Sequence, residues 1–213
     1  VMILFTVILG SATPIYNFGV ASAQGRQKSR KKKEPEPAPK PKDPTASLRI
    51  PDATVYDQNG NRLKFYTDLV KGKTVAINFI FTTCTAICPA LTATFRRVQQ
   101  QLGERVGQDV HLISVSVDPT TDVPERLKEY AAKFKAGPGW TFVTGDKVEI
   151  DSVLQALGTA VANKNDHTPM VLIGNESAGN WSRAYGLSPP TRLVDLIKAA
   201  ASKPVATTTK AGT

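Results

Sequence analysis

The stretch Thr74-Val-Ala-Ile-Asn-Phe-Ile-Phe-Thr-Thr-Cys84-Thr-Ala-Ile-Cys88-Pro89 decides the fold of this chain of 213 residues. Its first half, 74–82, is rich in β-branched and aromatic residues and predicts a buried strand. Residues 89–105 then show the periodicity of a helix. The chain's two cysteines therefore lie on a strand-to-helix turn, with Cys88 at or near the first helical turn.

The place of these cysteines favours reactive sulfur chemistry. Unpaired N–H groups and the dipole at a helix start favour negative charge, so a thiol there loses its proton more readily. If both cysteines join the helix, they lie on one face about 6 Å apart along the axis, near the upper limit for a disulfide. The two sulfurs are thus candidates for a redox disulfide or for ligation of one soft metal ion. A structural disulfide or two core thiols are the plainer alternatives.

The first 47 residues differ in composition from the rest. Residues 1–23 carry no charge and end in Ala21-Ser22-Ala23, which predicts an export signal or a membrane anchor. The basic residues that usually precede such a signal are missing. Residues 24–47 are basic and proline-rich and predict an extended linker. Residues 1–47 hold 8 Lys/Arg and 3 Asp/Glu, which is +5 of the net +9, so the remaining chain is only mildly basic and does not indicate nucleic-acid binding.

The rest of the chain predicts a folded domain over 48–203 and a disordered polar tail over 204–213. An Asn59-Gly60 pair between short alternating runs predicts an N-terminal β-hairpin. Asp122-Val-Pro-Glu125 resembles a capping box and predicts a helix ending near 135. Further strands are expected at 109–117, 140–144, 168–173 and 181–185, and further helices at 148–157 and 190–201. This order predicts an α/β, thioredoxin-like fold whose mostly parallel central sheet is flanked by helices.

One histidine has a place that suggests ligation. His167 directly precedes the strand predicted at 168–173, and in a thioredoxin-like sheet that loop faces the cysteine turn. Two thiolates and one imidazole form a soft, three-coordinate site suited to Cu(I), whereas structural zinc usually takes four protein ligands. His111, the other histidine, lies inside a strand pattern, which favours a core or surface role. Asp118 ends a core strand and is a candidate either to orient the site or to cap a turn beside Pro119.

These pieces resemble the Sco/SenC family of exported, copper-binding, thioredoxin-like proteins over roughly Leu48 to Ala200. The matching motifs are Cys84-Thr-Ala-Ile-Cys88-Pro89, then Ser116-Val-Asp118-Pro119 with Asp122 and Pro124, then Asp166-His167-Thr168. The resemblance implies copper held by Cys84, Cys88 and His167. It also implies a metallochaperone in the periplasm, or anchored to the membrane with its domain outside the cytoplasm. Its expected partner is a cytochrome oxidase subunit under assembly, or another copper or thiol protein.

The chain departs from the family pattern at two places, and the second, Pro169, keeps an enzymatic function open. The family tends to show Asp-Thr-Pro where this chain has Asp122-Val-Pro124, and it usually lacks a proline at the position of Pro169. Thioredoxins and related reductases do have a proline there, beside their cysteines. The alternative function is therefore a thiol-disulfide oxidoreductase, with Cys84 attacking and Cys88 resolving.

A peroxidase is a further alternative. Thr85-x-x-Cys88-Pro89 is similar to part of the peroxiredoxin active-site segment, which would make Cys88 the attacking thiol and Cys84 the resolving one. The proline expected four residues before Thr85 is absent, since Phe81 stands there.

Overall fold

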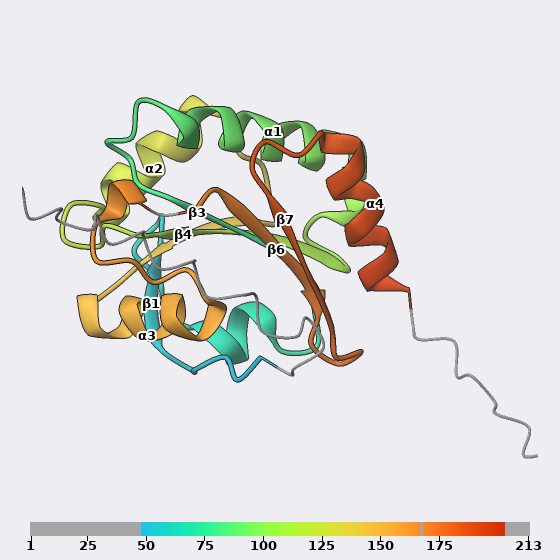
Figure 1. The fold of residues 1–213 in the computed structure, drawn as a ribbon, viewed down its shortest axis with the longest axis horizontal. Coiled ribbons are helices and arrows are strands. Elements are labelled where there is room, and N and C mark those ends of the chain that lie inside the picture. The colour runs from blue at the N-terminus through green and yellow to red at the C-terminus, as the bar shows by residue number, and fades with distance from the viewer. Residues whose placement is uncertain (1–47, 167, 203–213) are drawn as a thin grey trace, which may run out of the picture. The chain divides into compact units, whose positions relative to one another are not determined.

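In the computed structural model, the strand predicted before the cysteines is β3 (Thr74–Ile80), and it lies inside a seven-stranded sheet of order β2-β1-β5-β4-β3-β6-β7 (Figure 1). All seven residues of β3 are buried. A strand covered on both faces and paired on both edges reads as a continuous apolar run, which explains its sequence. The other strands are β1 (Thr54–Asp57), β2 (Arg62–Lys64), β4 (Val110–Ser116), β5 (Trp140–Thr144), β6 (Met170–Asn175) and β7 (Asn180–Tyr185).

The described residues are 48–166 and 168–202, all in the second of two compact units, residues 41–213. The predicted signal or anchor, the linker and the tail lie outside the described residues, and so does His167. Among the residues that are described, no helix has both the length and the apolar character needed to cross a membrane.

The strands run in mixed directions. β3, β4 and β5 are parallel to one another, because each is joined to the next by a helical crossover, α1 or α2. The hairpin β1–β2 joins β5 antiparallel, and β6 joins β3 antiparallel with Asn78 opposite Val171. The thioredoxin-like fold is therefore confirmed, but its parallel part is confined to the three central strands. Because β6 runs against β3, the residues that precede β6 lie at the end of the sheet where β3 and β4 finish.

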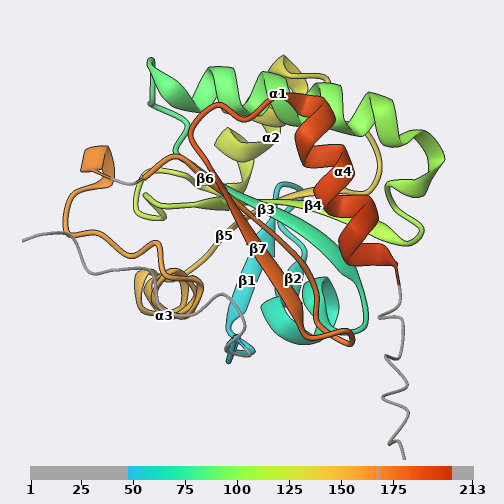
Figure 2. The same ribbon diagram turned by 45° about the vertical axis from the view of Figure 1, so that its right-hand side comes forward.

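Helices cover both faces of the sheet, as Figure 2 shows. One face packs against α1 (Ile87–Leu102), α2 (Pro124–Lys133) and α4 (Pro190–Ala201), each through an apolar stripe at helical spacing. The other face packs against α3 (Lys147–Leu157) and a short π-helix, η1 (Phe65–Val70). Two 3₁₀ turns, η2 (Gly103–Arg105) and η3 (Lys164–Asp166), complete the elements.

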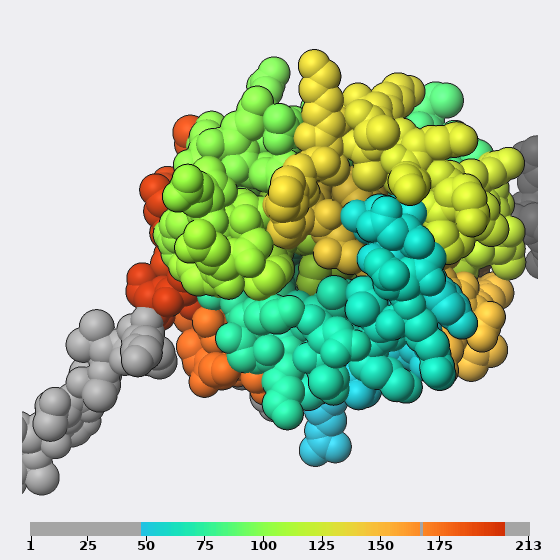
Figure 3. Space-filling view, turned by 180° about the vertical axis from the view of Figure 1, so that it is seen from behind, coloured from blue at the N-terminus to red at the C-terminus, as the bar shows by residue number. Residues whose placement is uncertain are grey.

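The predicted N-terminal hairpin is present, and Asp57 explains its tight turn. The Asp57 carboxylate accepts the backbone N–H groups of Asn59 and Asn61, both at 2.8 Å. Gly60 has a φ of +80°, a conformation that glycine adopts without steric cost. Figure 3 shows the hairpin and η1 covering much of the molecule's rear. The sequence did not predict η1, whose buried residues are Phe65, Leu69 and Val70.

A buried hydrogen-bond chain crosses the centre of the sheet under α1 and α2. Trp140 Nε1 on β5 donates to Ser114 Oγ on β4 at 2.9 Å, and Ser114 Oγ donates to Asn78 Oδ1 on β3 at 2.6 Å. All three residues are at least 98 % buried. These two hydrogen bonds align three strands laterally, whereas the buried Nδ2 of Asn78 has no hydrogen-bond partner among the described residues.

Candidate functional site

The cysteine turn joins β3 to α1. Cys84 N donates to the carbonyl of Phe81 at 3.1 Å, which closes a tight turn directly after the strand. Cys88 lies in the first turn of α1, as the sequence predicted, whereas Cys84 stands three residues before the helix begins at Ile87. Both thiols are free; Cys84 is half-buried and Cys88 is fully buried.

The sulfur of Cys84 accepts a hydrogen bond from the N-terminus of α1. The residue preceding the helix, Ala86, offers no side-chain acceptor, and Cys84 Sγ accepts the backbone N–H of Cys88 at 3.4 Å instead. Burial opposes ionisation of Cys84. Hydrogen bonds from the Cys88 thiol and from the backbone N–H groups of Cys88, Ala86 and Ile87 outweigh burial and lower the pKa of Cys84 below its ordinary value. Cys84 is therefore the half-exposed and more readily ionised member of the pair.

Cys88 has the opposite environment. Burial, together with its hydrogen bond to Cys84, raises the pKa of Cys88 to about 12. Its carbonyl accepts the hydroxyl of Thr92 at 2.8 Å, and that hydroxyl lies 2.9 Å from the phenol oxygen of Tyr130 on α2. Because the Thr92 hydrogen is engaged with Cys88, the Tyr130 hydroxyl donates to Thr92. The first turn of α1 is thus tied to α2 by a buried chain that no motif in the sequence indicated.

Asp122 holds the cysteine turn against the end of β4. Its fully buried carboxylate accepts the Thr82 backbone N–H at 3.1 and 3.2 Å, the Thr82 hydroxyl at 2.6 Å and the Ser116 hydroxyl at 2.6 Å. The capping-box prediction for Asp122 was wrong, because the residue preceding α2 is Val123 and it makes no side-chain cap. The carboxylate of Asp122 instead pairs with three donors, those of the half-buried Thr82 and the fully buried Ser116, which a position at an exposed helix end would leave unpaired.

Asp118 lies beside this network, at the end of β4. Its backbone N–H donates to Ser116 Oγ at 3.0 Å, and its carboxylate accepts from Thr120 Oγ1 at 3.0 Å and from Lys164 Nζ at 2.5 Å. Burial opposes ionisation of Asp118. Hydrogen bonds from Lys164, Thr121 and Thr120 outweigh it and hold the pKa of Asp118 below its ordinary value. Asp118 thus braces the turn after β4 and pairs with the segment that precedes β6, while its role in orienting a metal site stays a prediction.

Two further predicted residues, Pro169 and His111, lie at opposite ends of the sheet. His167 is outside the described residues; η3 ends at Asp166, and β6 begins at the end of the sheet where β3 and β4 finish. Pro169 directly precedes β6, and its carbonyl accepts the N–H of Gly186 at 2.8 Å. His111 pairs with Val75 near the start of β3, far from the cysteine turn along the strand. Among residues 48–166 and 168–202, no cluster of three or more His, Cys, Asp or Glu side chains is arranged to hold a metal ion.

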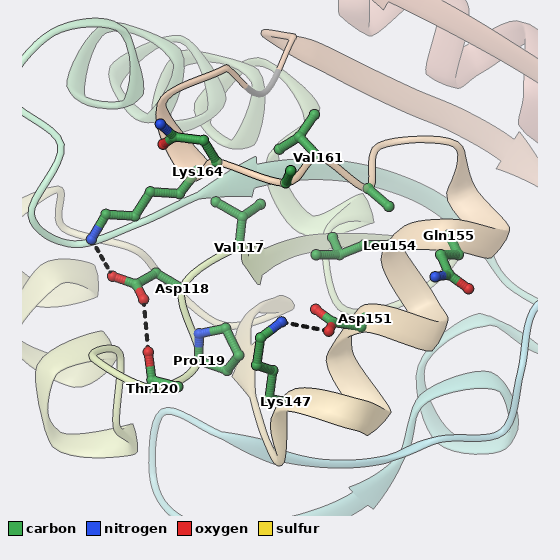
Figure 4. A pocket seen from close by; sticks show the side chains of 13 residues that line it. Val117, Asp118, Pro119, Thr120, Lys147, Asp151, Leu154, Gln155, Val161 and Lys164 are labelled. Carbon is green, nitrogen blue, oxygen red and sulfur yellow. Dashed lines mark hydrogen bonds and ion pairs between the residues drawn. The ribbon is translucent and has the colours of Figure 1, made fainter.

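A groove of about 770 Å³ opens next to Asp118 (Figure 4). It lies between the residues that follow β4, the exposed side of α3 and the segment leading to η3. Two ion pairs of equal length line it, Lys164–Asp118 and Lys147–Asp151, both at 2.5 Å. The first pair links separate segments of the chain, whereas the second lies within α3.

A thioredoxin-like sheet with a half-exposed and a buried thiol at the start of its first long helix defines a dithiol protein of the thioredoxin-like class. The SCO1/SenC family model matches residues 47–201, and the chain belongs to this family. The chain spans 52% and 61% of the length of the first curated relatives that it matches.

Three solved structures of Sco proteins are similar to this chain in fold. A SCO1/SenC family lipoprotein from Bacillus anthracis is 25% identical, with a TM-score of 0.64 over 74% of this chain and 97% of that one. ScoI from Bradyrhizobium japonicum, solved with copper bound, is 25% identical, with a TM-score of 0.57 over 70% and 96%. BsSco, a member of the Sco family of cytochrome c oxidase assembly proteins with a disulfide switch, is 28% identical, with a TM-score of 0.62 over 75% and 96%.

Proposed function

We propose that this protein is an exported copper metallochaperone that takes Cu(I) through Cys84, Cys88 and His167 and serves assembly of the copper site of a respiratory cytochrome oxidase. The observation that carries the proposal is the asymmetric dithiol at the start of α1. A half-exposed sulfur with a lowered pKa gives incoming copper a first thiolate, and a buried sulfur beside it gives a second. The copper-bound structure of Bradyrhizobium japonicum ScoI supports copper as the cargo.

The chemistry of the donors fits this cargo. Thiolate sulfur and imidazole nitrogen are the ligands that Cu(I) prefers, and a three-donor site leaves the ion accessible to a receiving protein. Cys88 must lose its proton to become a ligand, since its pKa is raised to about 12. Copper uptake therefore releases a proton from Cys88 and becomes tighter as the pH rises.

A second function, thiol-disulfide exchange, is favoured by the same lowered pKa. The Cys84 thiolate would attack one sulfur of a partner's disulfide and release the other as a thiolate. Cys88, after losing its proton, would then attack Cys84, form the Cys84–Cys88 disulfide and release the partner's remaining thiolate. Two electrons pass to the partner in this exchange. The disulfide switch of BsSco supports a redox role for such a pair.

The peroxidase alternative is the least supported. It requires Cys88 as the attacking thiolate, and a fully buried thiol whose pKa is raised to about 12 is a poor nucleophile at neutral pH.

A copper titration of the reduced full chain under anaerobic conditions, against a chromophoric Cu(I) chelator, tests the proposal. We expect one Cu(I) per chain and almost no binding after oxidation to the disulfide. His167→Ala should weaken binding by more than the roughly 10–100-fold that loss of an outer partner of a ligand costs. His111→Ala is the matched control and should bind like wild type, because His111 lies on β4 beside the start of β3, far from the cysteine turn.

The result also separates the two functions. If His167→Ala bound copper as tightly as wild type while it lost disulfide reductase activity, the metallochaperone function would be refuted and the oxidoreductase function would take its place. Cys84→Ser should remove disulfide formation and most copper binding together, because both need this sulfur.

Export is the remaining part of the proposal. It is supported by the charge-free segment 1–23 with its Ala-Ser-Ala sequence and by the Bacillus anthracis lipoprotein of the same family. A reporter that is active only outside the cytoplasm, fused after Lys203, should be active. Activity of a cytoplasm-dependent reporter alone would overturn the proposed location.

A further inference from the structure

The side chain of Lys164 joins three segments that are far apart in the sequence. Lys164 belongs to η3, in the loop between α3 and β6. Its ammonium lies 2.5 Å from Asp118 Oδ2, after β4, and 5.2 Å from the ring centroid of Phe81, after β3. Figure 4 shows the extended side chain crossing the groove to reach Asp118. A lysine held by both a carboxylate and an aromatic ring has a better-defined position than one in a solvated ion pair.

Both anchor points of Lys164 are rigid parts of the cysteine site. Phe81 is 95 % buried and its carbonyl closes the turn that carries Cys84. The side chain of Asp118 is 11% exposed, and its backbone is fixed by a hydrogen bond to Ser116. The loop before β6 is therefore attached to the cysteine turn by the Lys164 side chain.

The attachment lies close to His167 along the chain. His167 is the third residue after Lys164, which is at most about 11 Å of extended chain. On the other side, Met170 is buried in β6 and fixes the downstream end of the loop. Upstream of Lys164, residues 160–163 are all exposed, and the nearest buried residue is Thr159. Loss of the Lys164 contacts would thus lengthen the segment between fixed points from residues 165–169 to residues 160–169.

We propose that Lys164 is a positioning residue: its bridge to Asp118 and Phe81 holds the segment that precedes His167 beside the cysteine turn and so presents His167 to copper. This inference rests on the proposed function. Doubling the free segment reduces the local concentration of His167 about threefold by loop-closure scaling. Looser orientation of the imidazole brings the expected loss of copper affinity to about tenfold, the lower end of the range for outer partners of a ligand.

Four variants of the full chain test the proposal by Cu(I) competition. Lys164→Met keeps the aliphatic stem, removes the charge and should weaken copper binding about tenfold. Lys164→Arg can still reach a carboxylate and stack on a ring, so it should restore most of the affinity. Lys147→Met is the matched control, because Lys147 forms an ion pair of the same length in the same groove but only within α3. In a His167→Ala background, Lys164→Met should have no further effect.

Hydrogen exchange of the copper-free protein gives an independent measurement. Amides of residues 164–168 should exchange faster in Lys164→Met and remain unchanged in Lys147→Met. Wild-type copper affinity in Lys164→Met, or an equal loss in the presence and absence of His167, would overturn the positioning role. Wild-type affinity in His167→Ala would instead overturn the proposed copper site itself, and with it this inference.

Discussion

Replacement of Asp122 by alanine should destabilise the domain strongly, because this carboxylate connects the cysteine turn to the end of β4. Asp122→Ala removes the acceptor of the Thr82 N–H, the Thr82 hydroxyl and the Ser116 hydroxyl. A buried donor left without a partner costs about 1–3 kcal/mol. Ser116 is fully buried and Thr82 is half-buried, so a loss of about 3–5 kcal/mol in the free energy of unfolding is expected.

Asp122→Asn should cost less, about 1–2 kcal/mol. The amide keeps the shape and one acceptor oxygen, but its NH₂ group faces a donor and the charge that strengthens the hydrogen bonds is lost. The free energy of unfolding should therefore fall in a graded way, by less in Asp122→Asn than in Asp122→Ala.

Urea unfolding followed by tryptophan fluorescence measures this series, since Trp140 is 98 % buried in the core. Asp109→Ala is the matched control. Asp109 pairs with Arg105 at 2.6 Å, but its side chain is 53% exposed, so its loss should change stability by less than about 0.5 kcal/mol. A loss below about 1 kcal/mol for Asp122→Ala, or one equal to that of the control, would refute the reasoning.

Three further predictions concern the thiols, the sheet and pH. Iodoacetamide at pH 8 should modify Cys84 well before Cys88, as measured by peptide mass spectrometry, because burial and a pKa of about 12 protect Cys88; equal rates would contradict the assigned asymmetry. Ser114→Ala should lower the free energy of unfolding by about 2 kcal/mol in urea, since two buried partners lose their hydrogen bond, and an unchanged midpoint would contradict this. The folded state lowers the pKa of Asp118 below 3.8, so the stability that its ionised form contributes is present above 3.8 and is lost as the pH falls through the lower folded value. Thermal midpoints between pH 2 and 5 should consequently depend less on pH in Lys164→Met, and an unchanged slope would argue against the pairing.

Much of the fold could be predicted because its signals are local. The continuous apolar run of β3, the Asn59-Gly60 turn and the helical spacing of α1, α3 and α4 each indicate one element. The direction of β6 could not be predicted in this way, because it depends on the path of the chain around the sheet. The π-helix η1 follows directly on β2, and its three buried residues are too few to distinguish a strand end from a helix.

Only the sequence motifs of the site could be predicted, and not the contacts between its side chains. The spacing of Cys84 and Cys88 located the dithiol, but which sulfur ionises depends on where the backbone N–H groups at the start of α1 point. The capping-box prediction for Asp122 was wrong, because a carboxylate near a helix start resembles a cap in sequence while its buried partner Ser116 becomes evident only in the fold. Lys164 carried no signal, since its two contacts come from segments 46 and 83 residues away in the sequence.

The position of β3 between β4 and β6 has a consequence for the newly made chain. Residues 54–144 contain the strands of one side of the sheet, up to and including β3, but the opposite edge of β3 stays open until residues 170–175 follow. That edge is an apolar, β-prone strand of the kind that pairs with other chains and aggregates. At about 5–20 residues per second, synthesis from residue 80 to residue 175 leaves it uncovered for roughly 5–20 s. Chains that stop before β6 should therefore be aggregation-prone, and the nascent protein depends on β6 arriving before another strand takes its place.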